Sequence, residues 1–487
     1  MSEAPAPHGP AFGTAGIRGP LGDGPGCVNR TVVAQVAAGL AAWLAARAPG
    51  ASVVVGHDAR HQSDVFARDV AEIIAGADLR ASLLPGPLPT PVLAFAVGHL
   101  GASAGVMVTA SHNPGTDNGL KVFLDDTSQV AAPHDREIEA RIAQAATMPR
   151  SSAYERLDRS IVNSYLDAVS DPLPRAASNL RVAYTPLHGV GADLFLAAAA
   201  RTGFHDVHVV EEQAEPDPDF PTVPYPNPEE PGALDRLLTL SQQMHADLAI
   251  AHDPDADRCA VAVRDGTGMT LLTGDELGIL LADDLLARGA TGTFASSIVS
   301  SEMLGRLAAA HGQRWVQTLT GFKWLGKVPD LAFGYEEALG YCVRPDVSRD
   351  KDGISAALAI MRRAAELHHD GKTLLDRRDE LAREFGAHLT RQVAVRLPGL
   401  ADVDAALQRL QAAPPKALGG LPVLAIDDLQ SGFRGLPPTA GIRLGLDGAR
   451  VIVRPSGTEP KLKAYIEAGE PATLAAIADD VGRLLAT

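Results

Sequence analysis

A serine, a histidine and a lysine that could act together lie in one short segment of the chain. In Thr109-Ala110-Ser111-His112-Asn113-Pro114 the serine precedes the histidine, and Lys121 follows ten residues after the serine. A serine at the end of an apolar strand, with an imidazole beside it and an ammonium nearby, fits a nucleophile. The alternative interpretation is a turn in which Ser111 and Asn113 bond the local backbone. The segment lacks the G-x-S-x-G elbow, which disfavours an esterase of the α/β-hydrolase type.

A second segment offers three carboxylates at a spacing of two residues. In Asp253-Pro254-Asp255-Ala256-Asp257-Arg258 the three acids stand in a tight loop and can present oxygen atoms to one hard cation. An EF-hand is excluded, because its sixth and twelfth positions would be glycine and glutamate, and Arg258 and Arg264 stand there. A solvated acidic turn is the alternative, although three nearby carboxylates repel one another without a cation. A metal loop alone does not explain the arginine Arg258 directly after the acids, whereas an anion such as a phosphate that approaches the metal would explain it.

Two further loops carry groups that could bind an anion or hydroxyl groups. In Arg454-Pro455-Ser456-Gly457-Thr458-Glu459-Pro460-Lys461 the backbone N–H groups, two hydroxyls and two cations can converge on an anion, although a plain hairpin loop is the alternative. The paired acids Glu336 and Glu337, within residues 334–340, could accept hydrogen bonds from sugar hydroxyls. Residues 321–328 nearly spell a P-loop, but Val328 replaces its final serine or threonine, so nucleotide binding is not expected there.

The elements that must position these loops follow an alternating pattern. Short apolar runs that read as strands are each followed by a helical pattern, which predicts βαβ units and mostly parallel sheets; the runs are residues 52–55, 105–109, 181–184, 247–251 and 293–299. The last hundred residues are richer in strands and predict a separate α+β domain. We expect boundaries that divide the chain into residues 1–150, 151–266, 267–386 and 387–487. The proline-rich, acidic residues 215–231 read as an ordered surface loop rather than a linker.

Composition excludes several classes of protein. With 487 residues, 46% hydrophobic and 21% charged, the chain is neither disordered nor a coiled coil, and its length predicts three or four domains. Its three cysteines form no CxxC pair, which fits a reducing cytoplasm. The 43 basic and 59 acidic residues give a formal charge of −16, which argues against nonspecific nucleic-acid binding. Residues 32–46 are apolar but shorter than the ~20 residues of a membrane span, and the N-terminus does not read as a signal peptide.

Taken together, the motifs resemble a known family. The serine loop, the D-x-D-x-D-R loop, a Y-E-E-A-L-G loop and the R-P-S-G-T-E-P loop occur in this order after Phe12-Gly13-Thr14-Ala15-Gly16-Ile17-Arg18-Gly19. This combination closely resembles the α-D-phosphohexomutase family of phosphoglucomutases and phosphomannomutases, over essentially the whole chain. The resemblance implies an α/β protein of three similar mixed α/β domains plus a C-terminal α+β domain around a central cleft. The four domains would carry, in order, the phosphoserine loop, the metal-binding loop, the sugar-binding loop and the phosphate-binding loop.

The resemblance also implies a role for individual residues. Ser111 would carry the phosphoryl group and, with Asp253, Asp255 and Asp257, bind Mg²⁺. The catalytic groups around the transferring phosphoryl group would be Ser111, Arg18, His112, Lys121 and Arg258. Substrate would be bound by Lys323, Glu336 and Glu337 at the sugar and by Arg454, Ser456, Gly457, Thr458 and Lys461 at the distal phosphate. A sugar 1,6-bisphosphate would be the intermediate and activator.

The expected reaction interconverts hexose 1-phosphate and hexose 6-phosphate. Many relatives place a serine two positions after the acid that matches Glu336, but this chain has Ala338 there. Fewer polar groups mean weaker discrimination, so we expect both glucose and mannose phosphates to be turned over. The alternatives are a phosphopentomutase, a haloacid-dehalogenase-like phosphatase with Asp253 as nucleophile, or a non-enzymatic binding protein. The expected partner is a small phosphosugar, without nucleic acid or membrane, for a cytoplasmic monomer or homodimer.

Overall fold

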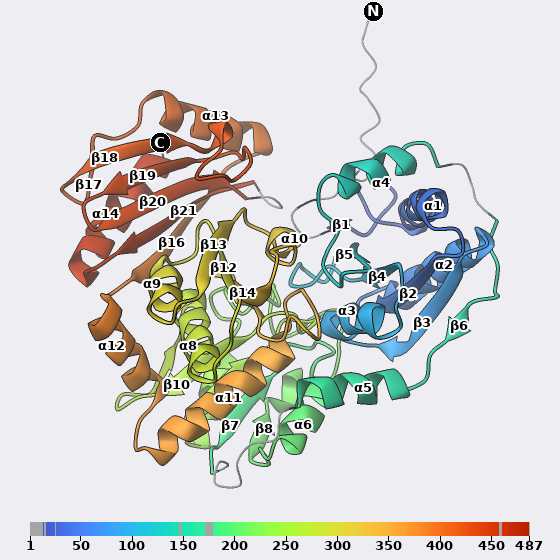
Figure 1. Cartoon of the computed structure of the whole chain (residues 1–487), viewed down its shortest axis with the longest axis horizontal. Helices are drawn as coiled ribbons and strands as arrows, with labels where there is room; N and C mark the ends of the chain where they lie inside the picture. The colour runs from blue at the N-terminus through green and yellow to red at the C-terminus, as the bar shows by residue number, and fades with distance from the viewer. Residues whose placement is uncertain are drawn as a thin grey trace, which may run out of the picture.

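A computed structural model describes residues 13, 16–24, 26–145, 149–170, 179–456 and 460–486. Four β-sheets follow one another along the chain, each with its own helices (Figure 1). The predicted fold class is therefore confirmed: three mixed α/β domains precede a C-terminal α+β domain. In Figure 1 the first domain lies at the right and the fourth at the upper left, with the second and third between them.

The first sheet has the strand order β1-β5-β4-β2-β3-β6. Strands β2, β3 and β4 are parallel, whereas β5 is antiparallel to β4 and to β1. All five residues of β4 are buried, because helices cover the sheet on both faces. The elements are β1 (Ile17–Pro20), α1 (Arg30–Arg47), β2 (Ser52–His57), α2 (Ser63–Gly76), β3 (Arg80–Pro87), α3 (Thr90–His99), β4 (Ala104–Val108), β5 (Asp117–Leu124), α4 (His134–Ile142) and β6 (Glu155–Arg156).

The second sheet has the order β11-β10-β9-β7-β8, and β7 is parallel to β8 and β9. Strand β10 returns antiparallel beside β9. Four apolar or small residues make up β9 and all are buried, as expected of a central strand. The elements are α5 (Ser160–Val169), β7 (Val182–Thr185), α6 (Ala192–Arg201), β8 (Val207–Val209), η1 (Glu211–Gln213), α7 (Asp235–Gln243), β9 (Leu248–Ala251), β10 (Ala260–Arg264) and β11 (Met269–Leu271).

The third sheet has the order β13-β12-β14-β15, with a short antiparallel strand β15 at its edge. Its helix α8 starts with a complete capping box between Thr273 and Glu276, which fixes where the helix begins. The elements are α8 (Gly274–Ala287), β12 (Thr293–Ser297), α9 (Met303–Ala310), β13 (Arg314–Thr318), α10 (Phe322–Leu325), β14 (Leu331–Glu336), β15 (Gly340–Cys342), α11 (Gly353–His369) and α12 (Leu374–Phe385).

The fourth sheet, β16-β21-β20-β19-β18-β17, is antiparallel throughout. Helices α13 and α14 pack on it around a hydrophobic core that is separate from that of the other domains. A small apolar cluster, Ile298, Val299, Leu429, Ile452 and Tyr465, joins it to the third domain. The elements are β16 (Leu389–Arg396), α13 (Leu400–Ala412), β17 (Ala417–Leu418), β18 (Leu421–Asp428), η2 (Leu429–Ser431), β19 (Ile442–Leu446), β20 (Ala449–Pro455), β21 (Lys461–Ala468) and α14 (Pro471–Leu485).

The expectation of mostly parallel sheets in the first three domains is confirmed, with one regular exception in each sheet. Strands β5, β10 and β15 each return antiparallel to the preceding central strand. The four chemistry-bearing segments are the connections of such antiparallel pairs: β4 to β5, β9 to β10, β14 to β15 and β20 to β21. Each motif therefore lies at one end of a strand pair, and the domains bring the four ends together.

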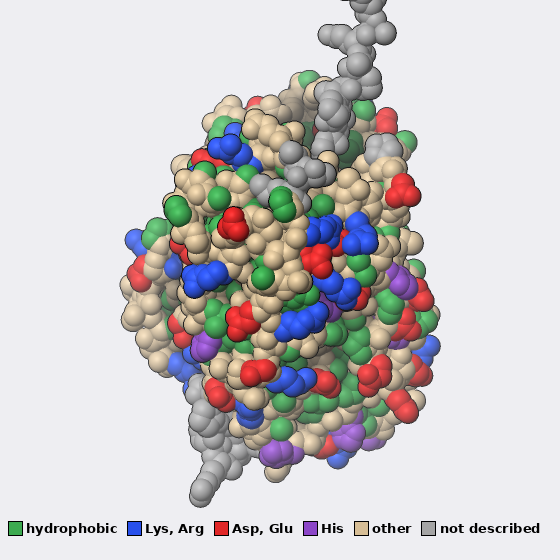
Figure 2. Space-filling view, turned by 90° about the vertical axis from the view of Figure 1, so that its right-hand side faces the viewer, with side chains coloured by type: hydrophobic (Ala, Val, Ile, Leu, Met, Phe, Trp, Pro, Cys, Tyr) green, Lys and Arg blue, Asp and Glu red, His purple; other side chains and the backbone are tan. Residues whose placement is uncertain are grey.

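The charged side chains on the surface agree with the net negative charge of the chain, which argued against a broad basic surface. On the face shown in Figure 2, Lys and Arg side chains alternate with Asp and Glu side chains, so no broad basic surface covers that face. Among the helices of the described residues, none is both long and apolar enough to cross a membrane.

Candidate active site

Ser111 stands in the loop between β4 and β5 in an unusual backbone conformation. Its φ of 53° lies in the left-handed region, which a residue with a Cβ rarely adopts, and its side chain is buried. The backbone N–H of Ser111 donates to Thr109 Oγ1 at 2.8 Å. Its own Oγ donates to Asp253 Oδ2 at 2.8 Å, across the boundary between the first and second sheets. The predicted nucleophile and the predicted metal loop are therefore in direct contact.

The three aspartates of the loop between β9 and β10 converge. One ligand oxygen from each of Asp253, Asp255 and Asp257 lies within 4.8 Å of the others, and all three side chains are buried. Burial, together with the two neighbouring carboxylates, raises the pKa of Asp253 to about 8. One oxygen each of Asp255 and Asp257 (Oδ1 in both) is buried without a hydrogen-bond partner. These two oxygen atoms are available to bind a further cation.

These donors fit a small hard cation. The set offers only oxygen atoms, which Mg²⁺ and Ca²⁺ prefer, and Ser111 Oγ lies beside it. Lys121 Nζ lies 2.6 Å from Asp255 Oδ2 and 2.5 Å from Asp257 Oδ2. Burial alone would raise the pKa of Asp255 and of Asp257, but the nearby Lys121 ammonium outweighs it, so both pKa values are lowered. The triad can thus hold a metal ion, with Lys121 as an additional cation beside it.

Arg258 connects the metal loop to His112. Its Nη2 donates to His112 Nε2 at 3.0 Å, and its Nη1 donates to Glu229 Oε2 at 3.0 Å. Burial, with Arg258 and Arg18 close by, lowers the pKa of His112 well below its ordinary value, so the imidazole is neutral at pH 7. Arg18 Nη1 lies 3.4 Å from Asn113 Oδ1 in the same loop. The predicted residues Arg18, His112 and Arg258 therefore line the cleft together with Ser111.

The predicted sugar loop places its two acids differently. The carboxylate of Glu336 accepts a hydrogen bond from the Gly321 backbone N–H, and burial, with Glu337 beside it, raises the pKa of Glu336 to about 7. Glu337 accepts hydrogen bonds from Ser297 Oγ at 2.9 Å and Ser300 Oγ at 3.0 Å. Glu337 is thus held by its own domain, which leaves Glu336 as the carboxylate better placed for a ligand.

Lys323 lies at a contact between the third and first domains. Its Nζ is 3.3 Å from the Gly13 carbonyl oxygen and 3.4 Å from Asp135 Oδ2. Lys323 is absent from the described residues that line the cleft, although Gly321 and Phe322 beside it line it.

The fourth domain closes the cleft. Arg454, Ser456 and Lys461 line it, whereas Gly457 and Thr458 lie outside the described residues. The cleft has a volume of about 490 Å³ and is lined by residues of all four domains; the lining includes Arg18, Ser111, His112, Asp257, Arg258, Glu336, Glu337, Lys351, Arg396, Arg454, Ser456, Lys461 and Lys463. Several of the cations come from neighbouring strands of the fourth sheet, which suits an anionic ligand.

Two lining residues that were not predicted from the sequence, Lys351 and Glu229, form ion pairs with predicted site residues. Lys351 precedes helix α11, and its Nζ lies 3.2 Å from Asp257 Oδ2 and 5.2 Å from the centre of the Phe322 ring. Helix α11 approaches the metal loop closely because Gly353 has no Cβ: one would lie 2.3 Å from the Arg258 carbonyl oxygen. Glu229 comes from the proline-rich loop. In the sequence, only the segment Asp350-Lys351-Asp352-Gly353 before a helix could have drawn attention to the lysine.

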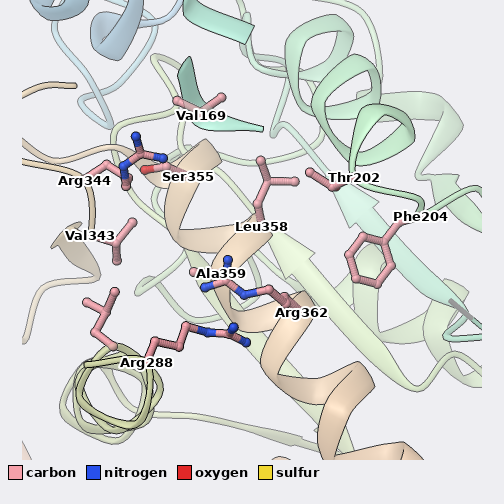
Figure 3. Close-up of a pocket in the computed structure, with 11 residues that line it drawn as sticks. Val169, Thr202, Phe204, Arg288, Val343, Arg344, Ser355, Leu358, Ala359 and Arg362 are labelled. Atoms are coloured by element: carbon pink, nitrogen blue, oxygen red, sulfur yellow. The ribbon is translucent and has the colours of Figure 1, made fainter. Parts of the chain in front are cut away.

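A separate pocket of about 240 Å³ lies between helices α5, α8 and α11 (Figure 3). Three arginines point toward it, but each has an acidic partner: Asp284 pairs with Arg288 and Arg362, and Asp346 pairs with Arg344. None of the predicted site residues is among the described residues that line it. The chemistry therefore belongs to the cleft.

Four protein-family models match the chain in succession. Three are described as the alpha/beta/alpha domains I, II and III of phosphoglucomutase/phosphomannomutase and match residues 9–148, 163–266 and 273–385. The fourth is the C-terminal domain of the same family and matches residues 393–484.

Relatives are similar over most of the chain. A protein of Haemophilus influenzae named "Probable phosphomannomutase" is 43% identical over 453 residues, which cover 91% of this chain and 93% of that protein. A phosphoglucomutase of Staphylococcus aureus is 33% identical over 493 residues, which cover 93% of this chain and 89% of that protein. A phosphoglucomutase/phosphomannomutase family protein of Burkholderia thailandensis shares the fold, with a TM-score of 0.77 at 20% identity over 97% of this chain and 96% of that one.

Proposed function

We propose, because this chain belongs to the phosphoglucomutase/phosphomannomutase family, that it interconverts the 1-phosphates and 6-phosphates of glucose and mannose. The enzyme is an intramolecular phosphotransferase. Relatives named for each of the two sugars support a substrate range that includes both. The observation that carries the proposal is the contact of Ser111 Oγ with Asp253, which joins a buried nucleophile to an acidic cluster inside a cationic cleft.

The reaction would proceed in two transfers. In the first, the bond between phosphorus and Ser111 Oγ breaks as a sugar hydroxyl oxygen bonds to phosphorus. The proton that the sugar hydroxyl gives up passes to the leaving Ser111 Oγ, so the products are a sugar 1,6-bisphosphate and the free serine hydroxyl. In the second, the bisphosphate has turned end over end, and Ser111 Oγ bonds to its other phosphorus as the bond from that phosphorus to the sugar oxygen breaks. The serine proton passes to the departing sugar oxygen, which becomes a hydroxyl again. Phosphoryl transfer depends on positioning and charge neutralisation, which Arg18, Arg258 and Lys121 would supply around Ser111.

We propose that Asp253, Asp255 and Asp257, with Ser111, hold Mg²⁺. When bound, that ion would neutralise charge on the phosphoryl oxygens. The distal phosphate would be bound by Arg454, Ser456 and Lys461, with Gly457 and Thr458 as further proposed ligands. Glu336 would bind the sugar from the cleft wall, and Lys323 would have to leave its contact with Gly13 to do so. The cleft volume of about 490 Å³ lies within the range of small-molecule sites, which suits a sugar phosphate as ligand.

The three free cysteines support a reducing compartment, so we propose a cytoplasmic enzyme that acts as a monomer or homodimer. The sugar phosphate itself is the proposed partner.

The proposed function is tested with the purified chain and Mg²⁺. Turnover of glucose 1-phosphate, mannose 1-phosphate and ribose 1-phosphate is measured side by side, with a trace of hexose 1,6-bisphosphate as activator. We expect the two hexoses to have kcat/KM values within about a hundredfold, a gap of under ~3 kcal/mol. A ribose preference above a hundredfold would overturn the hexose assignment.

Peptide mass spectrometry then locates the phosphoryl group. We expect phosphate on Ser111, and Ser111→Ala should lower kcat by several orders of magnitude, whereas Ser103→Ala in the same domain should not. Modification of Asp253 instead of Ser111 would favour a phosphatase. Near-normal turnover of a folded Ser111→Ala variant would show that another residue is the nucleophile.

A further inference from the structure

Arg60 lies behind the Ser111 loop rather than in the cleft. It follows strand β2, is only 4% exposed, and does not appear among the described residues that line the cleft. No motif drew attention to it, because a single arginine in Gly56-His57-Asp58-Ala59-Arg60 carries no spacing typical of a site. Its guanidinium nevertheless makes more contacts with the Ser111 loop than any predicted site residue described above.

All of these contacts are to backbone carbonyl oxygens. Arg60 Nη2 donates to Ser111 O and to Asn113 O, each at 2.5 Å. Its Nη1 donates to Pro114 O at 2.7 Å and to Asp117 O at 3.2 Å. The two terminal nitrogens of a guanidinium carry four N–H bonds, so each of the four carbonyl oxygens can accept from its own N–H. The loop is therefore folded around a single cation, which brings four carbonyl oxygens together.

The guanidinium is itself held in place. The Arg60 backbone N–H donates to Asp58 Oδ1 at 3.0 Å, and Nε lies 3.4 Å from Asp58 Oδ2. Ser63 Oγ donates to the same Asp58 Oδ1 at 2.7 Å, at the start of helix α2. The ring of Phe220, from the proline-rich loop of the second domain, lies 4.9 Å below the guanidinium carbon. Arg60 thus connects β2, the Ser111 loop and the second domain.

This arrangement explains how Ser111 keeps its unfavourable backbone. A residue with a Cβ holds a φ of 53° only when its surroundings impose it. Two hydrogen bonds fix Ser111 on either side: its N–H bonds Thr109 Oγ1, and its carbonyl oxygen bonds Arg60. With both in place, Oγ is aimed at Asp253 and the metal loop.

We propose that Arg60 is a positioning residue for phosphoryl transfer, which holds the Ser111 loop in its reactive conformation through four backbone carbonyls without touching the substrate. The inference rests on the proposed function, since it concerns the rate at which Ser111 gives and receives a phosphoryl group. Lysine cannot replace Arg60, because one ammonium with three radial N–H bonds cannot reach four carbonyls in the plane of a guanidinium.

The test compares Arg60→Lys and Arg60→Ala with Arg68→Lys, a matched control. Arg68 lies on the same domain, and its half-exposed side chain pairs with Asp64 at 3.7 Å. Misplacing a reacting group by about 1 Å can cost about a hundredfold in rate. We therefore expect kcat to fall about a hundredfold in both Arg60 variants, with KM within about threefold of the wild type. Arg68→Lys should behave as the wild type.

Two further measurements separate positioning from general damage to the fold. The rate at which hexose 1,6-bisphosphate phosphorylates Ser111, followed by quenching and mass spectrometry, should fall as much as kcat. Millimolar guanidinium ion should restore at least about a tenth of wild-type kcat to Arg60→Ala and leave Arg68→Lys unchanged. If Arg60→Ala does not fold, Arg60→Lys, with its own thermal unfolding curve, carries the comparison.

The inference is overturned if folded Arg60→Lys keeps kcat within threefold of the wild type. It is also overturned if KM rises while kcat is unchanged, which would make Arg60 a substrate ligand, or if Arg60→Ala folds but guanidinium does not rescue it. A wild-type chain that turns over no sugar phosphate would instead refute the proposed function, so the two failures are distinguishable.

Discussion

Replacing Glu467 with glutamine should loosen the attachment of the fourth domain in a pH-dependent way. Glu467, on β21, is 6% exposed and accepts hydrogen bonds from Arg450 Nε at 2.6 Å and Ser301 Oγ at 2.8 Å. His388 Nδ1, at 2.5 Å, and the backbone N–H of Glu302, at 3.1 Å, also contact its carboxylate. Arg450 also donates to the carbonyls of Ile298 and Ser300. This buried group of charges therefore joins the fourth domain to the third.

The size of the effect follows from the pKa of Glu467. Burial alone would raise that pKa, but His388 and Arg450 outweigh it and hold the pKa at about 2, against an ordinary 4.5. Each pKa unit corresponds to about 1.4 kcal/mol, so the ionised carboxylate stabilises the folded state by about 3 kcal/mol at pH 7. Loss of one partner from a buried ion pair costs about 3–5 kcal/mol, which agrees. A depressed carboxyl pKa stabilises the fold above pH 4.5, and this contribution is lost as the pH falls toward 2.

Hydrogen exchange followed by mass spectrometry on peptides of β20 and β21 measures this directly. We expect the opening free energy of these strands to be about 3 kcal/mol lower in Glu467→Gln than in the wild type at pH 7. The difference should shrink to about half at pH 3, where the wild-type carboxylate has lost much of its advantage. Glu212→Gln, which removes an exposed partner of Arg236, is the control and should change little. Equal exchange at pH 7, or a difference that stays constant down to pH 3, would refute the reasoning.

Two further predictions concern the cleft. Burial raises the pKa of Glu336 to about 7, so the carboxylate that we propose to bind sugar hydroxyls becomes protonated below that pH. We therefore expect kcat/KM to fall tenfold per pH unit below pH 7 and expect Glu336→Gln to abolish this fall. A variant with the same pH profile as the wild type would exclude Glu336. Asp255→Asn should weaken Mg²⁺ binding by about tenfold or more, measured by calorimetry, because one anionic ligand is lost. The control Asp265→Asn, in an exposed turn, should bind Mg²⁺ as the wild type does. Equal Mg²⁺ affinities of Asp255→Asn and the wild type would argue against the metal site.

The sequence was most informative where several chemical groups are consecutive. Ser111 and His112, or the three aspartates of the second loop, can be recognised because one loop supplies them all. Alternation of strands and helices also predicted the βαβ units of the first three sheets, while the arrangement of four domains followed from the family resemblance. The antiparallel return strands β5, β10 and β15 were missed because they are short or directly follow the polar loops, so their hydrophobic pattern looks like a continuation of the preceding unit.

Residues that act from a distance along the chain could not be predicted in the same way. Arg60 lies 51 positions before Ser111, and Lys351 lies 94 positions after Asp257, and the spacing of charges around each is not typical of a site. Their positions become meaningful only once β2 pairs with β4, or once helix α11 packs against the metal loop through Gly353. Long-range pairing of this kind is set by the packing of whole sheets, which local spacing does not encode.

The loop of residues 297–301 shows how such packing links two sites that the sequence treats as separate. Ser300 Oγ donates to the carboxylate of Glu337 in the sugar loop, while the carbonyl oxygen of the same Ser300 accepts from Arg450 in the fourth domain. Ser301 Oγ donates to Glu467. The loop that holds Glu337 therefore also contacts the fourth domain, to which Arg454 and Ser456 belong. Because Glu337 is held in this connection, its carboxylate helps to fix the loop after β14 relative to the fourth domain, and Glu336 is the carboxylate that we propose to bind sugar hydroxyls.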